Sequence, residues 1–167
     1  MALEQSSNVH PLSDKWTLWA HLPHDTDWSI KSYEKIMTFD TLEQLVSLND
    51  IIPETLVKKC MLFIMKDNIM PVWEDKNNIN GGCFSFKVNC KLIQSTWKNL
   101  GYALVCNIMT NNSKLSKNIN GITVSPKKAF CIIKIWMRNC DEQTTVNFNA
   151  IDGFNYNGCI FKRHTTS

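Results

Sequence analysis

The chain has 167 residues, of which 44% are hydrophobic and 20% charged, and its formal net charge is +3. This length and composition are typical of one globular domain with its own core, and the mild positive charge permits an anionic partner without requiring one. No window approaches the roughly 18 consecutive apolar residues of a membrane span, and the N-terminus lacks the features of a signal peptide. We therefore expect a cytoplasmic protein with no membrane association.

The N-terminal part of the chain predicts a tail, a strand and a loop, in that order. Residues 1–9 are polar and are expected to form a flexible tail ahead of one domain over 10–167. Residues 15–22 alternate between apolar and polar side chains, which predicts a strand that ends at Pro23. The expected inward side chains are Trp16, Leu18, Ala20 and Leu22. The polar segment that follows is a predicted loop, and it carries Trp28.

A first helix is predicted between Asp40 and Pro53. Asp40 and Glu43 have the spacing of an N-cap and third-position pair in a capping box. Apolar residues then recur at helical spacing until the proline, at Leu42, Leu45, Val46 and Leu48.

The rest of the chain mixes strands with a second helix. Short apolar runs predict strands at residues 60–66, 83–88, 121–125, 129–136 and 159–163. Apolar residues recur every three or four positions over 93–108, which predicts a longer amphipathic helix, and 141–154 is an expected abbreviated helix. Mixed order and hairpin-length connections favour an α+β fold, with an antiparallel sheet and helices on one side.

Six tryptophans are unusual in so short a chain. Trp16, Trp19 and Trp97 occupy regular positions in predicted strands or helices, so we expect them to pack in the core or on the sheet. Trp28 and Trp73 instead lie in polar loop sequence, where aromatic side chains more often serve recognition. The pattern alone leaves packing and ligand contact open for these two.

The loop over residues 71–82, PVWEDKNNINGG, places an indole beside two carboxylates. Two loop indoles facing each other would accept a flat ring, and a cationic ring would gain a further cation–π attraction. The carboxylate of Glu74 could then accept hydrogen bonds from a ring edge such as the N1–H and N2 amine of guanine. Asp75 is better placed as a turn or cap residue.

Catalytic and metal-binding patterns are weak in this sequence. Glu74 and Asp75 could serve as a general acid and base, but no recognisable triad or nucleophile motif accompanies them. The two glycines at 81–82 lack the Lys-Ser/Thr that follows a phosphate-binding loop. The seven cysteines have no Cys-x-x-Cys pair and the four histidines no metal spacing, so we expect free thiols, no metal and no cofactor.

The ordered set of segments HPLSDKWTLW, Trp28, FDTLEQL, IMPVWEDKNNINGG, Trp97 and GITVSPKKAFCIIKIW resembles the eukaryotic translation initiation factor 4E family, which binds the 7-methylguanosine cap of messenger RNA. The resemblance covers about residues 10–136, and Pro-x-Trp-Glu-Asp-x-x-Asn-x-x-Gly-Gly is its most specific part. It implies a single curved antiparallel sheet backed by helices, with a cap-binding slot on the concave face. The Asn- and Lys-rich composition would suit a divergent, viral member acting in the cytoplasm of its host.

The resemblance also implies a role for each residue of the base site. Trp28 and Trp73 would sandwich the methylated guanine, and Glu74 would bind its Watson–Crick edge. Trp136 falls where the family has an aromatic side chain against the N7 methyl group.

The phosphate side departs from the family pattern. Cys83 stands where a basic residue follows the two glycines, Lys127 where the family has Arg, and Ile132 where it has Lys. The remaining candidates for the cap phosphates are Lys127, Lys128 and Lys134. Lysine binds phosphate as a point charge and arginine bidentately, so we expect a weakened grip on the phosphate chain.

The partner surface departs too. Family members hold a scaffold protein, or its competing repressors, through a Trp in the first helix and a Leu-Glu pair in the second. The corresponding surface of this chain comprises His10, Pro11, Leu42, Val46, Lys98 and Asn99. Here Val46 replaces the Trp, and Lys98 and Asn99 replace the Leu-Glu pair, so we expect either a co-adapted partner or none.

The expected function is therefore that of a non-enzymatic, monomeric cap-binding protein that promotes recruitment of capped mRNA for translation initiation. The alternative is a cap-binding repressor or decoy that does not recruit the usual scaffold. Two hypotheses come from other classes of protein. One is a hydrolase that uses Glu74 and Asp75, and the other is an interaction module without cap binding. The segment after Trp136 is short, so the family's contacts to the nucleotide after the cap would fall to Arg163 or His164.

Overall fold

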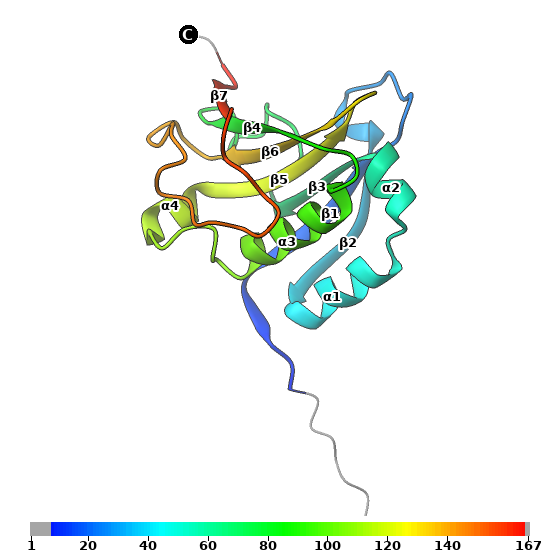
Figure 1. Cartoon of the computed structure of the whole chain (residues 1–167), viewed down its shortest axis with the longest axis horizontal. Coiled ribbons are helices and arrows are strands. Elements are labelled where there is room, and N and C mark those ends of the chain that lie inside the picture. Colours follow the sequence, from blue (N-terminus) through cyan, green and yellow to red (C-terminus); the bar gives the residue numbers. More distant parts are fainter. Residues whose placement is uncertain (1–7, 166–167) are drawn as a thin grey trace, which may run out of the picture.

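One antiparallel sheet of seven strands forms the frame of the molecule (Figure 1). The computed structural model describes residues 8–165. The strands, in chain order, are β1 (Pro11–His21), β2 (Tyr33–Thr41), β3 (Met61–Lys66), β4 (Gly82–Val88), β5 (Ile119–Pro126), β6 (Cys131–Met137) and β7 (Ile160–Arg163). Their order across the sheet is β2-β1-β3-β5-β6-β4-β7, and every pair is antiparallel. The sheet is curved and unclosed, which confirms the predicted α+β class.

Helices lie against one face of this sheet (Figure 1). They are α1 (Leu42–Ile51), α2 (Glu54–Lys59), α3 (Ile93–Val105) and α4 (Ser113–Asn118), with a short 3-10 turn at Ile30–Ser32. In α3, apolar residues three and four apart form one buried stripe that includes Ile93, Trp97, Leu100 and Leu104. The predicted second helix is thus confirmed, although it ends at Val105 rather than reaching Ile108. None of the helices within residues 8–165 is long and apolar enough to span a bilayer.

The main core lies between this helical layer and the sheet. Trp16, Leu18 and Ala20 of β1 point into it because alternate residues of a strand share a face. Trp97 enters the same core from α3, as predicted. Leu22 does not belong to the set, because it follows the end of β1 and is exposed.

The first helix begins one residue later than the sequence suggested. Thr41, not Asp40, is the N-cap: its hydroxyl accepts a hydrogen bond from the backbone N–H of Gln44, whose side chain binds the Thr41 N–H in return. Asp40 remains within β2, a strand that sequence analysis missed. β2 is an edge strand with a single fully buried residue, Phe39, so it carries little hydrophobic alternation.

The segment over residues 141–154 is not a helix, which corrects the prediction. Its polar side chains bond to nearby groups instead: Asn147 donates to Glu142 and Thr144 donates to the same carboxylate. Such local bonds compete with helix formation. Gly153 adopts a positive φ of 75°, which helical backbone does not allow. Phe154, at the end of the segment, packs on Phe86 of β4 and so closes the core without a helix.

Two short helices were missed, α2 and α4, both of six residues. Six residues make fewer than two helical turns, too few for a repeating apolar pattern to be recognised. The seven cysteines are all free thiols, as predicted. Part of the expected N-terminal tail, residues 1–7, lies outside the described residues.

Candidate functional site

The face of the sheet opposite the main core carries a second, smaller cluster. Its buried members are Phe63, Met65, Ile69, Cys83 and Trp136, with Trp19, Tyr33 and Met61 packed against them. These residues alternate along β1, β3, β4 and β6 with residues of the main core. Trp19 therefore packs on the sheet, as predicted, but on the face away from the helices. An aromatic face of this kind provides a floor for a planar ligand.

Trp28 lies at the rim of this face, in the loop after β1. Its indole is 58% exposed and stacks in parallel on the imidazole of His21, with ring centroids 4.1 Å apart and an interplanar angle of 2°. His21 is buried at the end of β1, and its Nε2 lies 2.9 Å from the carbonyl oxygen of Asp27. The Asp27 carboxylate in turn accepts a hydrogen bond from the backbone N–H of Ser29. One side of the Trp28 indole is therefore supported by protein.

Trp73 is held outward by a loop with an internal hydrogen-bond network. The Asp75 carboxylate accepts from the backbone N–H of Met70 at 2.9 Å. Asn78 is fully buried, and its side-chain amide donates to the carbonyl of Met70 at 3.1 Å. Asn120 of β5 donates to the Asn78 side-chain oxygen at 2.9 Å and so ties the loop to the sheet. Asp75 is therefore a turn residue, as predicted, and the Trp73 indole remains 45% exposed.

Glu74 is exposed, and its charge acts on the aromatic face. Burial raises the pKa of the Tyr33 phenol, and the negative charge of Glu74 raises it further. Tyr33 also lies edge-on to His21, with centroids 5.1 Å apart. Trp28 and Glu74 are thus connected through His21 and Tyr33. Across the described residues, the indoles of Trp28 and Trp73 make no ring contact with each other.

Trp136 is buried in the sheet and makes a side-chain hydrogen bond, whereas Trp28 and Trp73 are exposed in loops. It is 7% exposed, and its Nε1–H donates to the hydroxyl of Thr123 on β5 at 2.7 Å. His164, just after β7, lies against it with centroids 5.1 Å apart. The short C-terminal part of the chain therefore reaches this face. Sequence analysis considered His164 only for a nucleotide beyond the cap, and it missed His21, Tyr33 and Thr123, whose positions become visible only from strand register.

Cys83 and His164 form a close pair, with 3.7 Å between Sγ and Nε2. Burial raises the pKa of the Cys83 thiol to about 12, against a smaller opposing effect of the Lys134 charge. Burial and the same lysine lower the pKa of His164 to about 4. Both groups are therefore uncharged near neutral pH, so the pair has no thiolate nucleophile. Within residues 8–165, no three His, Cys, Asp or Glu side chains are grouped to hold a metal ion.

The candidate phosphate ligands lie at two places: Lys134 is in the middle of β6, and Lys127 and Lys128 precede the strand. Lys134 is two residues from Trp136, so the two share a face, and its charge acts on both Cys83 and His164. Lys127 and Lys128 are exposed in the turn before β6. At about 3.3 Å per residue, the start of that strand is roughly 17 Å from Trp136.

The partner-surface residues fall into two groups on the helical side. His10, Pro11 and Leu42 line one hollow of about 220 Å³. The Glu43 carboxylate accepts hydrogen bonds from the His10 side chain and backbone, which lower the pKa of Glu43 to about 2. Val46 is 41% exposed on α1.

Lys98 and Asn99 are half-buried on α3, where the C-terminal segment covers part of the helix. The Asn99 side chain donates to the carbonyl of Asp152 at 3.1 Å, and Thr96 donates to the carbonyl of Gly153 at 3.2 Å. Asn99 is therefore engaged within the protein itself.

Comparison with known proteins identifies relatives of this chain. The family model described as eukaryotic initiation factor 4E matches residues 11–152. The Candida albicans eukaryotic translation initiation factor 4E is 28% identical over 149 residues, which cover 83% of this chain and 69% of that protein. The human factor is 27% identical over 140 residues, covering 82% and 64%. The factor 4E-2 of Schizosaccharomyces pombe is 29% identical over 145 residues, covering 81% of this chain but only 56% of its own length.

Solved structures show the same fold. The Ascaris suum eIF4E-3 in complex with an m7G cap has a TM-score of 0.71 and 27% identity, covering 80% of this chain and 76% of that one. The Caenorhabditis elegans eIF4E-3 in complex with the 4E-binding protein Mextli and a cap analog also has a TM-score of 0.71, with 26% identity and coverage of 79% and 76%. Because the family model spans most of the sequence, this chain belongs to the eukaryotic initiation factor 4E family.

Proposed function

We propose that this chain binds the 7-methylguanosine cap of mRNA and promotes recruitment of capped transcripts for translation initiation in the cytoplasm. Family membership and the cap complexes of its structural relatives support the proposal. In this proposal the protein acts as a monomer. It needs no catalysis, because recognition of a base requires only stacking and hydrogen bonds.

The observation that carries the proposal is the unequal exposure of the six tryptophans. Trp16, Trp97 and Trp136 are buried and Trp19 is half-buried, whereas Trp28 and Trp73 are exposed. Both exposed indoles are held by structured loops rather than left at a chain end. Exposed aromatic side chains on a fixed support favour ligand contact over packing.

In this proposal, Trp28 and Trp73 stack on the two faces of the base. N7 methylation makes guanine cationic, which strengthens its attraction to indole and to a carboxylate. Glu74 accepts the N1–H and N2 amine donors at the base edge. Its exposed carboxylate is next to Trp73 in sequence and acts on Tyr33, which adjoins the support of Trp28. Trp136 closes the slot near the N7 methyl group.

The cap phosphates would meet few cations. Lys134 is the candidate beside Trp136, while Lys127 and Lys128 approach from the far end of β6. Cys83, opposite Trp136 on β4, and His164, which lies against Trp136, are neutral and add no charge. Binding should therefore depend mainly on the base.

The partner surface supports two outcomes. The hollow at His10, Pro11 and Leu42 would receive an initiation scaffold or a co-adapted equivalent. A repressor or decoy role is favoured by Val46, which offers no aromatic anchor, and by Asn99, which already bonds to the C-terminal segment. A pull-down of initiation scaffold with the purified protein separates the two, since a decoy would leave the scaffold behind.

Titration of tryptophan fluorescence with 7-methylguanosine triphosphate tests the central claim, with guanosine triphosphate as the unmethylated control. We expect stronger quenching and tighter binding for the methylated nucleotide, and weaker binding with a smaller methyl preference in Glu74→Ala. Glu34→Ala is the matched control, because Glu34 is an exposed acid on β2. Equal binding of both nucleotides by the wild type would refute the proposal. Release of nucleotide from capped RNA in the presence of a divalent metal would instead indicate hydrolysis.

A further inference from the structure

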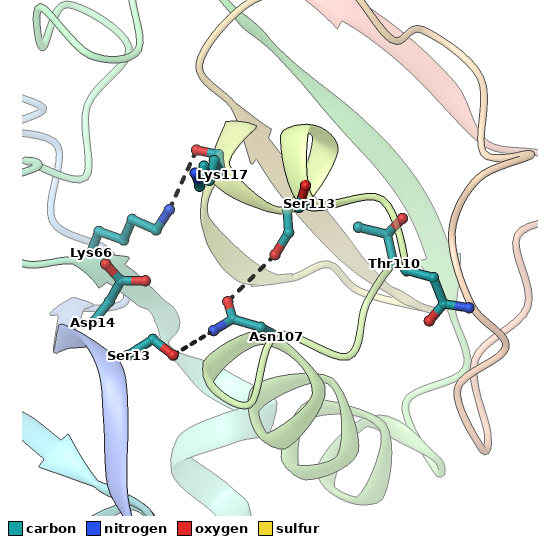
Figure 2. A pocket seen from close by; sticks show the side chains of 9 residues that line it. Ser13, Asp14, Lys66, Asn107, Thr110, Ser113 and Lys117 are labelled. Atoms are coloured by element: carbon teal, nitrogen blue, oxygen red, sulfur yellow. Dashed lines mark hydrogen bonds between the residues drawn. The ribbon is translucent and has the colours of Figure 1, made fainter.

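Two adjoining hollows form a basic groove along the side of the molecule where β1, β3 and α4 meet, and Figure 2 shows the first of them. The first, of about 600 Å³, lies between β1, the end of β3 and the α3–α4 segment. The second, of about 510 Å³, lies between β1, the β3–β4 loop and the residue after β6. Asp14 and Lys66 line both hollows and join them.

Positive charge is concentrated in this basic groove. Its lining includes five cations, Lys15, Lys66, Lys76, Lys117 and Arg138, but only two carboxylates, Asp14 and Asp67. The ion pairs found over residues 8–165 join His10 to Glu43 and Lys58 to Glu54, so none of the five cations is in a salt bridge there. The groove therefore holds as much net positive charge as the formal charge of the whole chain.

Lys66 lies at the centre of the groove and is preorganised. Its Nζ donates to the carbonyl of Lys117 at 3.4 Å (Figure 2). Its ammonium lies 5.9 Å from the ring centre of Trp16. Burial lowers the pKa of Lys66, partly offset by the charge of Asp14, and the positive charge of Arg138 lowers it further. An anion in the groove would relieve the repulsion between Lys66 and Arg138.

The first hollow adds neutral hydrogen-bonding groups to these charges. The Asn107 side-chain amide donates to the Ser13 hydroxyl at 3.1 Å, and its oxygen accepts from Ser116 at 3.4 Å. Thr110 and Ser113 also line this hollow. The amides and hydroxyls could contact the sugars of a nucleic acid strand, and the neighbouring cations could contact its phosphates.

We propose that the basic groove binds the sugar–phosphate backbone of single-stranded RNA. A protein partner fits less well, because protein interfaces depend on apolar or aromatic anchors and Ile69 is the one apolar residue in the lining. A single phosphate ion would fill only a small part of two joined hollows. The groove is separate from the candidate cap slot, although Lys76 belongs to the loop of Trp73 and Arg138 follows Trp136 by two residues.

The test is fluorescence anisotropy with a short labelled uridine oligonucleotide that has a 5′ hydroxyl and no cap, measured over a range of salt. Lys117→Glu combined with Arg138→Glu removes two groove cations that are exposed and make no side-chain hydrogen bond within the described structure. Lys114→Glu combined with Lys31→Glu is the matched control, since both are exposed and neither lines the groove.

We expect the groove variant to bind RNA roughly tenfold more weakly or worse, and its salt slope to fall by about 1.4, the value for two lost phosphate contacts on a single strand. The control should change affinity less than twofold, about the level of a general charge effect. Circular dichroism must show both variants folded. If Lys117→Glu with Arg138→Glu unfolds the protein, the same comparison with alanine at these positions replaces it.

Several outcomes would overturn the inference: no RNA binding by the wild type at low salt, equal loss in the control, full displacement of RNA by inorganic phosphate, or tighter groove-dependent binding of a glutamate-rich peptide. Displacement of the uncapped oligonucleotide by 7-methylguanosine triphosphate would place the RNA in the cap slot and also refute it. Because the probe carries no cap, this result is independent of the proposed cap binding.

Discussion

The indole of Trp28 lies parallel to the imidazole of His21 at 4.1 Å between ring centroids. His21 is the last residue of β1, and its Nε2 is within 2.9 Å of the Asp27 carbonyl, so a rigid strand end supports an exposed loop aromatic. Preorganisation of this kind lowers the entropy lost when a ligand stacks on the free side of the indole.

His21→Ala should therefore weaken binding of 7-methylguanosine triphosphate. An aromatic pair of this kind contributes about 0.5–1.5 kcal/mol, which corresponds to roughly a two- to tenfold loss of affinity. His21→Phe retains the stacking surface and should bind nearly as the wild type does. Fluorescence titration of both variants checks this, and equal affinity in the alanine variant would contradict the supporting role.

Asn78→Ala should destabilise the loop that presents Trp73. The substitution removes the side-chain donor to the carbonyls of Met70 and Val72, and it removes one of the two acceptors of the buried Asn120 amide. Unsatisfied buried groups of this kind cost about 2–3 kcal/mol in total. Denaturant unfolding measures the loss. Asn80→Ala, exposed in the same loop, is the control, and a similar effect of both changes would argue against a specific network.

Acid should destabilise the protein through His164. Its pKa is about 4 in the folded chain against 6.5 for the ordinary group, so the unfolded chain binds a proton first as the pH falls. The free energy of unfolding should decrease between pH 6.5 and 4, by about 1–2 kcal/mol after allowance for the partial exposure of the ring. His164→Phe should flatten this part of the stability curve, and an unchanged curve would refute the assignment.

Phe154→Ala should show that the irregular C-terminal segment is part of the core. Phe154 is buried against Phe86, and loss of such a ring costs about 3–5 kcal/mol. Val146→Ala, in the same segment but exposed, should stay within about 0.5 kcal/mol of the wild type. Thermal unfolding of both variants distinguishes a packed segment from a loose one, for which both changes would be neutral.

Lys134→Ala should weaken binding of 7-methylguanosine triphosphate more than binding of the monophosphate, and Lys127→Ala should do so less. The reason is that Lys134 is two residues from Trp136 and on the same face of β6, whereas Lys127 precedes the start of that strand. With few phosphate contacts, the salt dependence of triphosphate binding should be shallow. A steep dependence would show that several cations hold the phosphates.

The sequence by itself determined most of the strands, the two longer helices and the recognition loop, although not β2, α2 or α4. Hydrophobic alternation predicted β1 and β4, because neighbouring residues of a strand face opposite sides whatever the rest of the chain does, and a short apolar run predicted β3. The Asn, Gly and acidic residues of the 71–82 segment likewise specified a turn, and Asp75 makes the expected local bonds. The burial of Trp16 followed from strand alternation, and the burial of Trp97 followed from the helical repeat of apolar residues.

The tertiary structure alone decided which distant residues meet. The support of Trp28 by His21, the bond from Trp136 to Thr123 and the approach of His164 depend on strand register and on the path of the C-terminal segment. The basic groove likewise draws its cations from several separate segments. Contacts between residues far apart in sequence arise from the packing of the whole sheet, so they cannot be predicted from local periodicity.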